Sequence, residues 1–266
     1  MNVTKKVAVC SRSFSQNSVL RSELLAAYKQ VTFNDAGLQL KGDSLVEFLS
    51  GHDKAIIALE AMDESVLSRL PKLQVISKYG VGMDKIDIAA IRTHGKRLGW
   101  TGGVNRRSVS ELVISFAIAL LRHVPAAHRE VLSGSWNQQL GNYLTGKTVG
   151  IIGCGHIGKD LVSLLQAFDC PVLVNDILDF PEFYAAHSIE VVNLEELLKR
   201  SDVVTLHVPL DDSTRGMLDG QRLALLKPSA VLINIARGDL VDEVALKQML
   251  QDKRLAAAAF DVFAEE

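Results

Sequence analysis

The stretch GKTVGIIGCGHIGKDLVSLLQAF, residues 146–168, decides the fold of this chain. It begins with an apolar run over 148–152, which predicts a buried strand, and it ends in the apolar spacing of a helix. Between the two, Gly153, Gly155 and Gly158 stand in the G-x-G-x-x-G spacing. A strand, a glycine turn and a helix in this order are typical of the first unit of a doubly wound parallel sheet.

Each glycine of this turn has a separate physical role. Gly153 permits the tight turn, Gly155 lets a pyrophosphate approach the backbone, and Gly158 lets the helix pack closely on the strand. The helix begins near His156 and Ile157, and its free N–H groups and positive dipole end favour an anion there. The stretch therefore predicts a dinucleotide site.

The next apolar run, PVLVND, ends at Asp176, which is 176 − 158 = 18 residues beyond the last glycine. A carboxylate at this position accepts hydrogen bonds from the adenosine ribose hydroxyls and repels a 2′-phosphate. The segment NDILDF, residues 175–180, contains no Arg or Lys, so NAD is favoured over NADP. A lone G-x-G-x-x-G is weak evidence, but here the flanking strand, helix and acidic residue all agree with it.

Three more apolar runs follow, at 202–209, 230–238 and 256–263, each after a helical pattern. Ligands of a doubly wound sheet lie outside the carboxyl ends of its strands. Those ends present His207, then Arg237, then Asp261 and Glu266.

Arg237 is suited to a carboxylate or carbonyl substrate, because a guanidinium binds such groups in a planar, bidentate manner. The alternative is that Arg237 caps its own loop through Asp239 or Glu243.

Before residue 102 the chain has its own pattern of strands and helices. Apolar runs at 6–11, 54–59 and 73–78 alternate with amphipathic stretches, which predicts one small α/β domain over 1–101. GWTGGVN, residues 99–105, reads as a flexible crossing to a second domain over 102–266. A long apolar helix over about 106–133 follows, with a capping box between Ser108 and Glu111 and a kink at Pro125.

Composition agrees with two globular domains. The chain has 266 residues, of which 48% are hydrophobic, enough for a core in each domain. Its net charge is −2, so it has no positive electrostatic field that would favour nucleic acid or an anionic membrane as a partner. Its three cysteines lack metal-ligand spacing, so no metal site is expected and the thiols are expected to be reduced and buried. With no signal-peptide pattern and no apolar run near 18 residues, we expect a cytoplasmic protein.

Several motifs in order carry a family resemblance. The segments at 77–88, 102–122, 153–158, 201–218, 233–246 and 258–266 resemble those of the D-isomer-specific 2-hydroxyacid dehydrogenases, most closely the phosphoglycerate-dehydrogenase-like branch. The resemblance extends over nearly the whole chain. It implies an α/β fold of two doubly wound domains: a flavodoxin-like substrate domain and a Rossmann NAD-binding domain. It also implies NAD as cofactor, a small 2-hydroxy or 2-keto acid as substrate, and a homodimer.

The resemblance also assigns roles to residues. Arg237 corresponds to the catalytic arginine that orients the substrate, and Glu266 to the acidic residue that pairs with the catalytic histidine. Asp261 corresponds to the residue that holds the nicotinamide carboxamide, together with the backbone of Ile235 and Ala236. The substrate loop corresponds to Tyr79, Gly80, Val81 and Gly82, the cleft lining to Asn105, and the adenine and phosphate segment to His207, Pro209 and Thr214.

One part of the family pattern has no counterpart in these 266 residues. Hydride transfer needs a general base, which in the family is a histidine of a Pro-His segment beyond the position of Glu266. None of the seven histidines is an obvious substitute, so we expect this chain alone to be weakly active or inactive. Three explanations stay open: a fragment, a natural truncation, or a sequence from which disordered residues were left out.

The substrate and the class of function leave alternatives. The segment IIALEAMD, residues 56–63, offers Glu60 and no basic residue, which argues against 3-phosphoglycerate and for a small 2-hydroxy acid with an uncharged tail. Lys78 is either an anion contact or a solvated lysine. The rival function is an NAD(H)-sensing binding protein without turnover, like the family's corepressor relatives.

Overall fold

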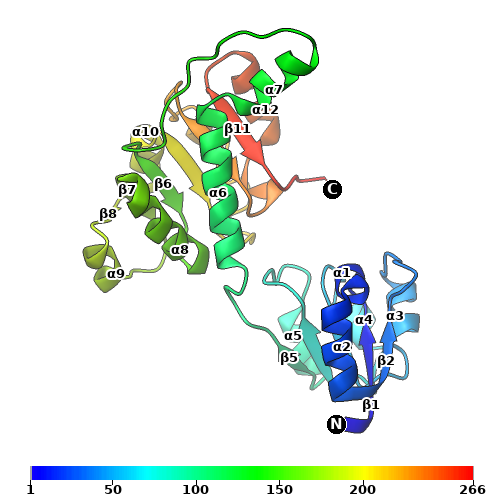
Figure 1. Ribbon diagram of the computed structural model, residues 1–266. Helices are drawn as coiled ribbons and strands as arrows, with labels where there is room; N and C mark the ends of the chain where they lie inside the picture. The colour runs from blue at the N-terminus through cyan, green and yellow to red at the C-terminus, as the bar shows by residue number, and fades with distance from the viewer. Residues whose placement is uncertain (1, 266) are drawn as a thin grey trace. The chain divides into compact units, whose positions relative to one another are not determined.

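The computed structural model describes residues 2–265, except the side chains of residues 2 and 3 (Figure 1). The chain forms two compact units, Met1–Val104 and Asn105–Glu266. We call them unit 1 and unit 2. The change of unit falls three residues later than the expected change of domain at 101/102.

Unit 1 is a parallel α/β sheet with the strand order β2-β1-β3-β4-β5. This is the flavodoxin-like order, as expected, and its topological switch point lies between β1 and β3. The strands are β1 (Asn2–Val9), β2 (Tyr28–Phe33), β3 (Lys54–Ile57), β4 (Val75–Lys78) and β5 (Arg97–Gly99), and the helices are α1 (Arg12–Gln16), α2 (Ser18–Ala27), α3 (Asp43–Leu49), α4 (Glu64–Leu67) and α5 (Ile88–Thr93).

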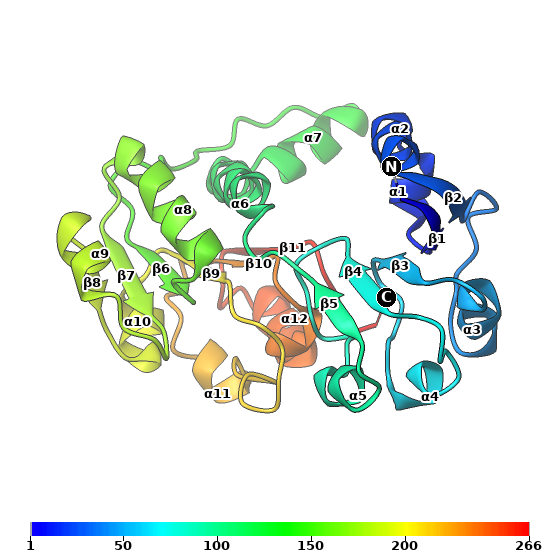
Figure 2. The same cartoon turned by 90° about the horizontal axis from the view of Figure 1, so that it is seen from below.

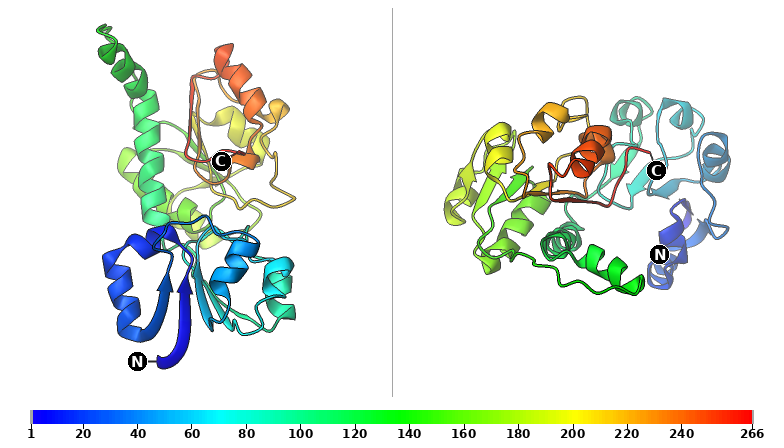
Figure 3. Two further views of the ribbon diagram at one scale, coloured as in Figure 1. Left: turned by 90° about the vertical axis from the view of Figure 1, so that its right-hand side faces the viewer. Right: turned by 90° about the horizontal axis from the view of Figure 1, so that it is seen from above.

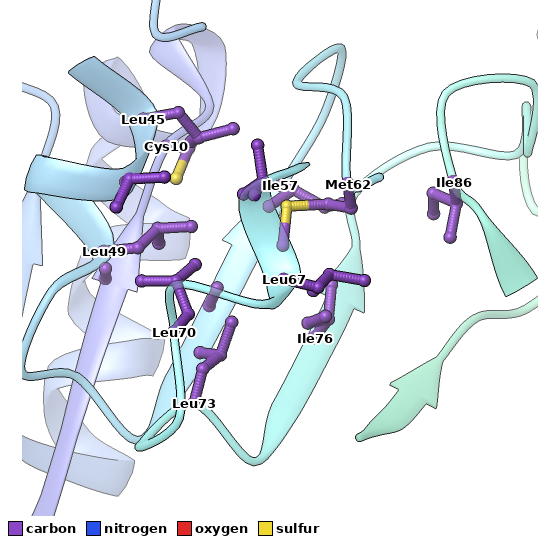
Figure 4. Close-up of a cluster of buried hydrophobic side chains, with 14 of the residues drawn as sticks. Cys10, Leu45, Leu49, Ile57, Met62, Leu67, Leu70, Leu73, Ile76 and Ile86 are labelled. Carbon is purple, nitrogen blue, oxygen red and sulfur yellow. The ribbon is translucent and has the colours of Figure 1, made fainter. Parts of the chain in front are cut away.

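The core of unit 1 lies between the sheet and helices α3, α4 and α5. Ile57 and Ile76 of neighbouring strands are fully buried there against Leu45 and Leu67 of the helices (Figure 4). Helices α1 and α2 lie on the opposite face (Figure 3, left). Because both faces are covered, the central strands read as continuous apolar runs.

Unit 2 is a six-stranded parallel sheet with the order β11-β10-β9-β6-β7-β8. Counted from β6 as the first strand, this is the Rossmann order 3-2-1-4-5-6. The strands are β6 (Val149–Ile152), β7 (Val172–Asn175), β8 (Glu190–Val191), β9 (Val203–Leu206), β10 (Val231–Asn234) and β11 (Ala257–Phe260). The helices are α6 (Arg106–Leu121), α7 (Val124–Leu132), α8 (His156–Leu165), α9 (Pro181–Ala186), α10 (Leu194–Arg200), α11 (Gly220–Leu223) and α12 (Glu243–Gln251), with 3-10 turns η1 (Gln166–Phe168) and η2 (Gly238–Leu240).

Successive residues on the strands of unit 2 supply two separate cores. Ile151 is buried in the cluster that contains residues of α6 and α8, and Ile152 in the cluster that contains residues of α10, α11 and α12. Figure 2 shows the two sets of helices on opposite sides of the sheet, and Figure 3 (right) shows α6 and α12 in the same arrangement. The sheet is therefore covered on both faces and leaves its strand ends for ligands.

The expected single helix over 106–133 is wrong. The chain breaks at His123, which is left-handed with φ 56°, and Pro125 lies in the first turn of α7, so α6 and α7 meet at 61°. The capping box is also wrong, because α6 begins at Arg106 with Asn105 as its N-cap. The Ser108 hydroxyl then lies inside the first turn and donates to the Asn105 carbonyl, 2.9 Å away.

No single helix among residues 2–265 is long and apolar enough to cross a membrane. The bent pair of α6 and α7 together has the length and the apolar composition of a membrane span, but by these two criteria only. Residues Ser110, Val113, Ala117 and Leu121 of α6 are buried in unit 2.

Candidate active site

The glycine turn after β6 is shaped by close backbone packing. Gly153 has φ 98°, and a Cβ on it would lie 2.7 Å from the carbonyl oxygen of His207. A Cβ on Gly158 would lie 2.3 Å from the Gly153 carbonyl oxygen. No atom lies within 4 Å of the equivalent position on Gly155. The first and last glycines are thus required by the fold, and the middle one faces open space.

Helix α8 starts directly after this turn, with Gly155 as its N-cap and His156 and Ile157 as its first residues. No side chain caps this end, and no acidic residue stands in its first turn. The first N–H groups of a helix have no partner within the helix, and the dipole is positive there. The end of α8 therefore has the features that bind the pyrophosphate of a dinucleotide.

Asp176 follows β7 and lies beside the glycine turn. One carboxylate oxygen accepts a hydrogen bond from the Cys154 N–H at 2.5 Å, and the other accepts from Leu178 N–H at 2.8 Å. A carboxylate here is suited to ribose hydroxyls and opposes a 2′-phosphate. Lys159 in the first turn of α8 lies over the ring of Phe180 at 3.4 Å, so its charge is held by an aromatic face.

His207 follows β9, and its backbone packs against the glycine turn; the residue as a whole is half-buried. Its Nε2 is 3.0 Å from Thr205 Oγ1, and its buried Nδ1 has no partner among the described residues. Burial lowers the pKa of His207 to about 3, so the ring is neutral near pH 7. His207 therefore does not serve as a general base.

Two hydrogen bonds of the Thr214 side chain stabilise the loop after His207. The Thr214 hydroxyl donates to the Pro209 carbonyl at 2.7 Å and accepts from Asp211 N–H at 2.9 Å. These bonds hold Pro209 and Thr214 together in one loop at the carboxyl end of β9.

A buried asparagine that the sequence interpretation missed shapes the turn carrying Arg237. The Asn234 side chain at the end of β10 is fully buried; it donates to the Arg237 carbonyl at 2.8 Å and accepts from Ala236 N–H at 3.1 Å. The backbone carbonyl of Asn234 accepts a hydrogen bond from Asp261 N–H at 3.1 Å. Asn234 thus joins the turn 235–237 to the end of β11. The signal in the sequence was a lone amide in an apolar strand.

Arg237 has extended backbone, and its Nη1 donates to the Ala236 carbonyl at 2.7 Å. The two carboxylates that were alternative partners have other contacts: Asp239 pairs with Arg215, and Glu243 accepts from Ala264 N–H at 2.9 Å. A Cβ on Gly238 would lie 2.0 Å from the backbone of Phe263, so the segment after Asp261 packs directly on this turn. Glu266, the predicted partner of a catalytic histidine, lies outside the described residues.

The predicted substrate loop of unit 1 begins at the end of β4. Tyr79 N–H donates to the Ile57 carbonyl at 2.7 Å, while the Trp100 indole N–H donates to the Val81 carbonyl at 3.0 Å. Gly80 has φ 130°. The N–H groups of Gly80, Val81 and Gly82 have no hydrogen-bond partner within residues 2–265. Such a run of free N–H groups can bind a carboxylate.

Two further candidates have distinct surroundings. Asn105, at the start of α6 in unit 2, has a buried Oδ1 without a hydrogen-bond partner in the part of the chain described. The Lys78 ammonium in unit 1 donates to the Ala58 carbonyl, so it is not simply solvated.

The cysteines are free thiols. Cys10 and Cys154 are buried, as expected, whereas Cys170 is only partly buried. Burial, and then the nearby Asp176 carboxylate, raise the pKa of Cys154 to about 11, which keeps this thiol of the glycine turn protonated. Among residues 2–265 no group of His, Cys, Asp and Glu is arranged to hold a metal ion.

Comparison with known proteins defines the class of this chain. Residues 114–266 match the family described as D-isomer specific 2-hydroxyacid dehydrogenase, NAD binding domain. The chain belongs to this family, and unit 2 is its NAD-binding domain.

Individual relatives are similar over most of the chain. The D-3-phosphoglycerate dehydrogenase of Methanocaldococcus jannaschii is 33% identical over 251 residues, which are 93% of this chain and 48% of that protein. The (S)-sulfolactate dehydrogenase of Chromohalobacter salexigens is 38% identical over 208 residues, 77% of this chain and 67% of that protein. The solved D-lactate dehydrogenase of Aquifex aeolicus with NAD and lactic acid is 26% identical, with a TM-score of 0.83 over 99% of this chain and 78% of that one. The chain spans about half the length of the phosphoglycerate dehydrogenases that it matches.

Proposed function

We propose that the protein is an NAD-dependent D-2-hydroxyacid dehydrogenase that transfers a hydride between the nicotinamide and C2 of a small 2-hydroxy or 2-keto acid. The observation that carries this proposal is the carboxyl edge of the sheet in unit 2. There the glycine turn after β6 and Asp176 form a dinucleotide site, and Arg237 leaves the same edge two strands away, after β10.

Each proposed role follows from the chemistry of the group. NAD, when bound, accepts or supplies the hydride. The Arg237 guanidinium binds the substrate carboxylate and polarises the carbonyl that is reduced. The free N–H groups of Gly80, Val81 and Gly82 bind the carboxylate. Asp261, placed by its bond to Asn234, orients the nicotinamide carboxamide together with the backbone of Ile235 and Ala236.

The reaction also needs a group that takes up and returns the hydroxyl proton. The His207 ring is neutral, and His156 is the first residue of α8, where its backbone belongs to the glycine turn. Neither is a suitable base. We propose that the 266-residue chain by itself binds NADH but turns over slowly or not at all.

The test uses the protein in the form that the cell makes, with excess NADH and a panel of 2-keto acids. We expect NADH consumption with at least one acid, and a loss of kcat/KM of roughly 10²–10³-fold in Arg237→Gln, because the variant lacks the charge that stabilises the transition state. NADH affinity should stay unchanged. Arg254→Gln is the matched control, since Arg254 is an exposed arginine just before the amino end of β11. Full activity in Arg237→Gln would contradict the proposed role.

NADH binding without reduction of any acid would instead favour the sensing function. Energy transfer from Trp136, which is 79% exposed in unit 2, measures this binding. A change of oligomeric state on NADH addition, with no turnover, would overturn the dehydrogenase proposal.

We also propose that the protein is a homodimer. The support is an apolar surface on α7 and the segment that follows it, where Leu132, Trp136, Leu140 and Tyr143 are 74–88% exposed. Large apolar side chains exposed in one short segment favour an interaction surface there.

A further inference from the structure

Unit 1 contains a pocket that none of the roles above uses. It has a volume of about 510 Å³ and lies outside the carboxyl ends of β2, β1 and β3. Its walls are the residues that follow these three strands: Leu38–Lys41, Ser11–Ser13 with Gln16, and Ala58–Glu60. The pocket thus opens at the β1/β3 switch point of the flavodoxin-like sheet, where ligands of such sheets bind.

We propose that this pocket binds a second anionic group of the substrate, and that Arg12 is its main ligand. The substrate class is then a 2-hydroxy acid with a carboxylate, sulfonate or phosphate at the far end of the molecule. This inference rests on the dehydrogenase proposal, because it names the substrate of the same site.

Two cationic side chains line the pocket without an internal partner. The Arg12 guanidinium and the Lys41 ammonium have no hydrogen bond or ion pair within the part of the chain described. Glu60 is the opposing charge, and its carboxylate accepts from Ala58 N–H at 2.6 Å. The charged residues that line the pocket are therefore two cations and one anion, which leaves one net positive charge. The anion, Glu60, is already hydrogen-bonded. An oxyanion is the ligand that the remaining groups favour.

Contacts join the elements around the pocket to the start of the predicted substrate loop. Ala58 lines the pocket, and its carbonyl accepts from Lys78, the residue that precedes the loop. Tyr79 N–H donates to the carbonyl of Ile57, the residue before Ala58, and the Tyr79 ring packs edge-on against Phe14 of α1, with centroids 5.3 Å apart. The helix that carries Arg12 therefore contacts the loop with the free N–H groups.

The dimensions suit a substrate with two anionic ends. Strand β1, which leads to Arg12, is two positions from β4, which leads to the loop, so the strand ends are roughly 10 Å apart. A 2-hydroxy acid with its carboxylate on the N–H groups of Gly80–Gly82 would extend its other end past Ala58. Arg12 lines the same pocket as Ala58, and its long side chain is suited to meet that end. Arg12 then supplies the positive charge that the segment after β3 lacks.

The experiment compares matched pairs of acids, lactate with 3-sulfolactate and glycerate with 3-phosphoglycerate, in oxidation by NAD. For Arg12→Gln we expect the KM of the charged member to rise about 10–100-fold, as for loss of a charge-assisted hydrogen bond. The KM of the uncharged-tail member and kcat should change less than about twofold. Arg12→Lys should restore part of the preference. Arg97→Gln is the control, because Arg97 opens β5 at the opposite edge of the same sheet. Equal effects of Arg12→Gln on both members of a pair, or no effect, would overturn the inference.

Equilibrium binding of the same four acids in the presence of NADH separates this inference from the function. Tighter binding of the charged acids that is lost in Arg12→Gln supports the anion site even if no acid is oxidised, in which case the dehydrogenase proposal alone fails. Turnover of uncharged-tail acids, without any dependence on Arg12, leaves the dehydrogenase proposal standing and overturns the anion site.

Discussion

At the scale of single residues, Asp176 combines two tasks that the sequence motif does not separate. Its carboxylate holds the glycine turn through Cys154 N–H, and it presents a negative charge where the adenosine ribose is expected. A variant that keeps the hydrogen-bond acceptor but removes the charge distinguishes these tasks.

We predict that Asp176→Asn lowers the preference for NADH over NADPH at least tenfold and leaves the melting temperature within about 2 °C of the wild type. The single amide oxygen can still accept from Cys154 N–H, and water can replace the lost contact at the exposed Leu178 N–H. Asp176→Ala should weaken NADH binding more, since it also loses the turn contact. Fluorescence titration with both nucleotides measures the ratio. Asp179→Ala is the control, as an exposed carboxylate three residues along. If the ratio of NADH affinity to NADPH affinity is unchanged in both Asp176 variants, Asp176 does not contact the adenosine ribose.

The spacing of the sequence motif located Gly153, Gly158 and Asp176, since their tasks depend on local backbone. Asn234 and Arg12 were missed for a physical reason: their importance arises from neighbours far away in the sequence. Asn234 matters because it joins β10 to the end of β11, and Arg12 because β1 lies beside β3.

At the scale of elements, the glycine turn packs closely against α8. Substitution of single glycines at this contact tests whether they have separate roles. Ala at Gly158 would place its Cβ against the Gly153 carbonyl, whereas Ala at Gly155 meets no atom of the protein and has an ordinary φ of −75°.

We predict that Gly158→Ala destabilises unit 2 by about 1–3 kcal/mol, which lowers its melting temperature by roughly 2–12 °C. Gly155→Ala should leave the melting temperature within about 2 °C but weaken NADH binding more than tenfold, because the new methyl group stands where the pyrophosphate approaches. Calorimetry and titration of the two variants check this pair. A stable Gly158→Ala, or a Gly155→Ala that binds NADH normally, would contradict it.

The strands around the turn were predicted from their apolar runs, and β6, β7, β9, β10 and β11 lie where expected. Strands β2, β5 and β8 were missed because they contain exposed positions and lack continuous apolar runs; β5 and β8 are also short. The α6–α7 break was only half predicted: Pro125 indicated a kink, but the left-handed His123 ends the first helix.

At the scale of the whole molecule, the apolar surface after α7 predicts self-association. We expect the protein to sediment as a dimer at micromolar concentration, and Leu132→Glu with Leu140→Glu to produce monomers, because a charge buried without a partner disfavours the interface. Val244→Glu is the control, since Val244 is 81% exposed on α12 instead. A wild-type monomer at this concentration would contradict the proposed dimer.

The sequence by itself determined the two parallel α/β units, the glycine turn and the acidic residue after β7, because these depend on backbone conformation and local periodicity. The resemblance of several motifs, in order along the chain, also indicated the family. Only the tertiary structure decided that the His207 ring is neutral, that Asn234 holds the turn of Arg237, and that Arg12, Lys41 and Ala58 line one pocket. Burial, pKa and pocket lining depend on which distant strands lie side by side, and that neighbourhood is set by packing of the whole sheet.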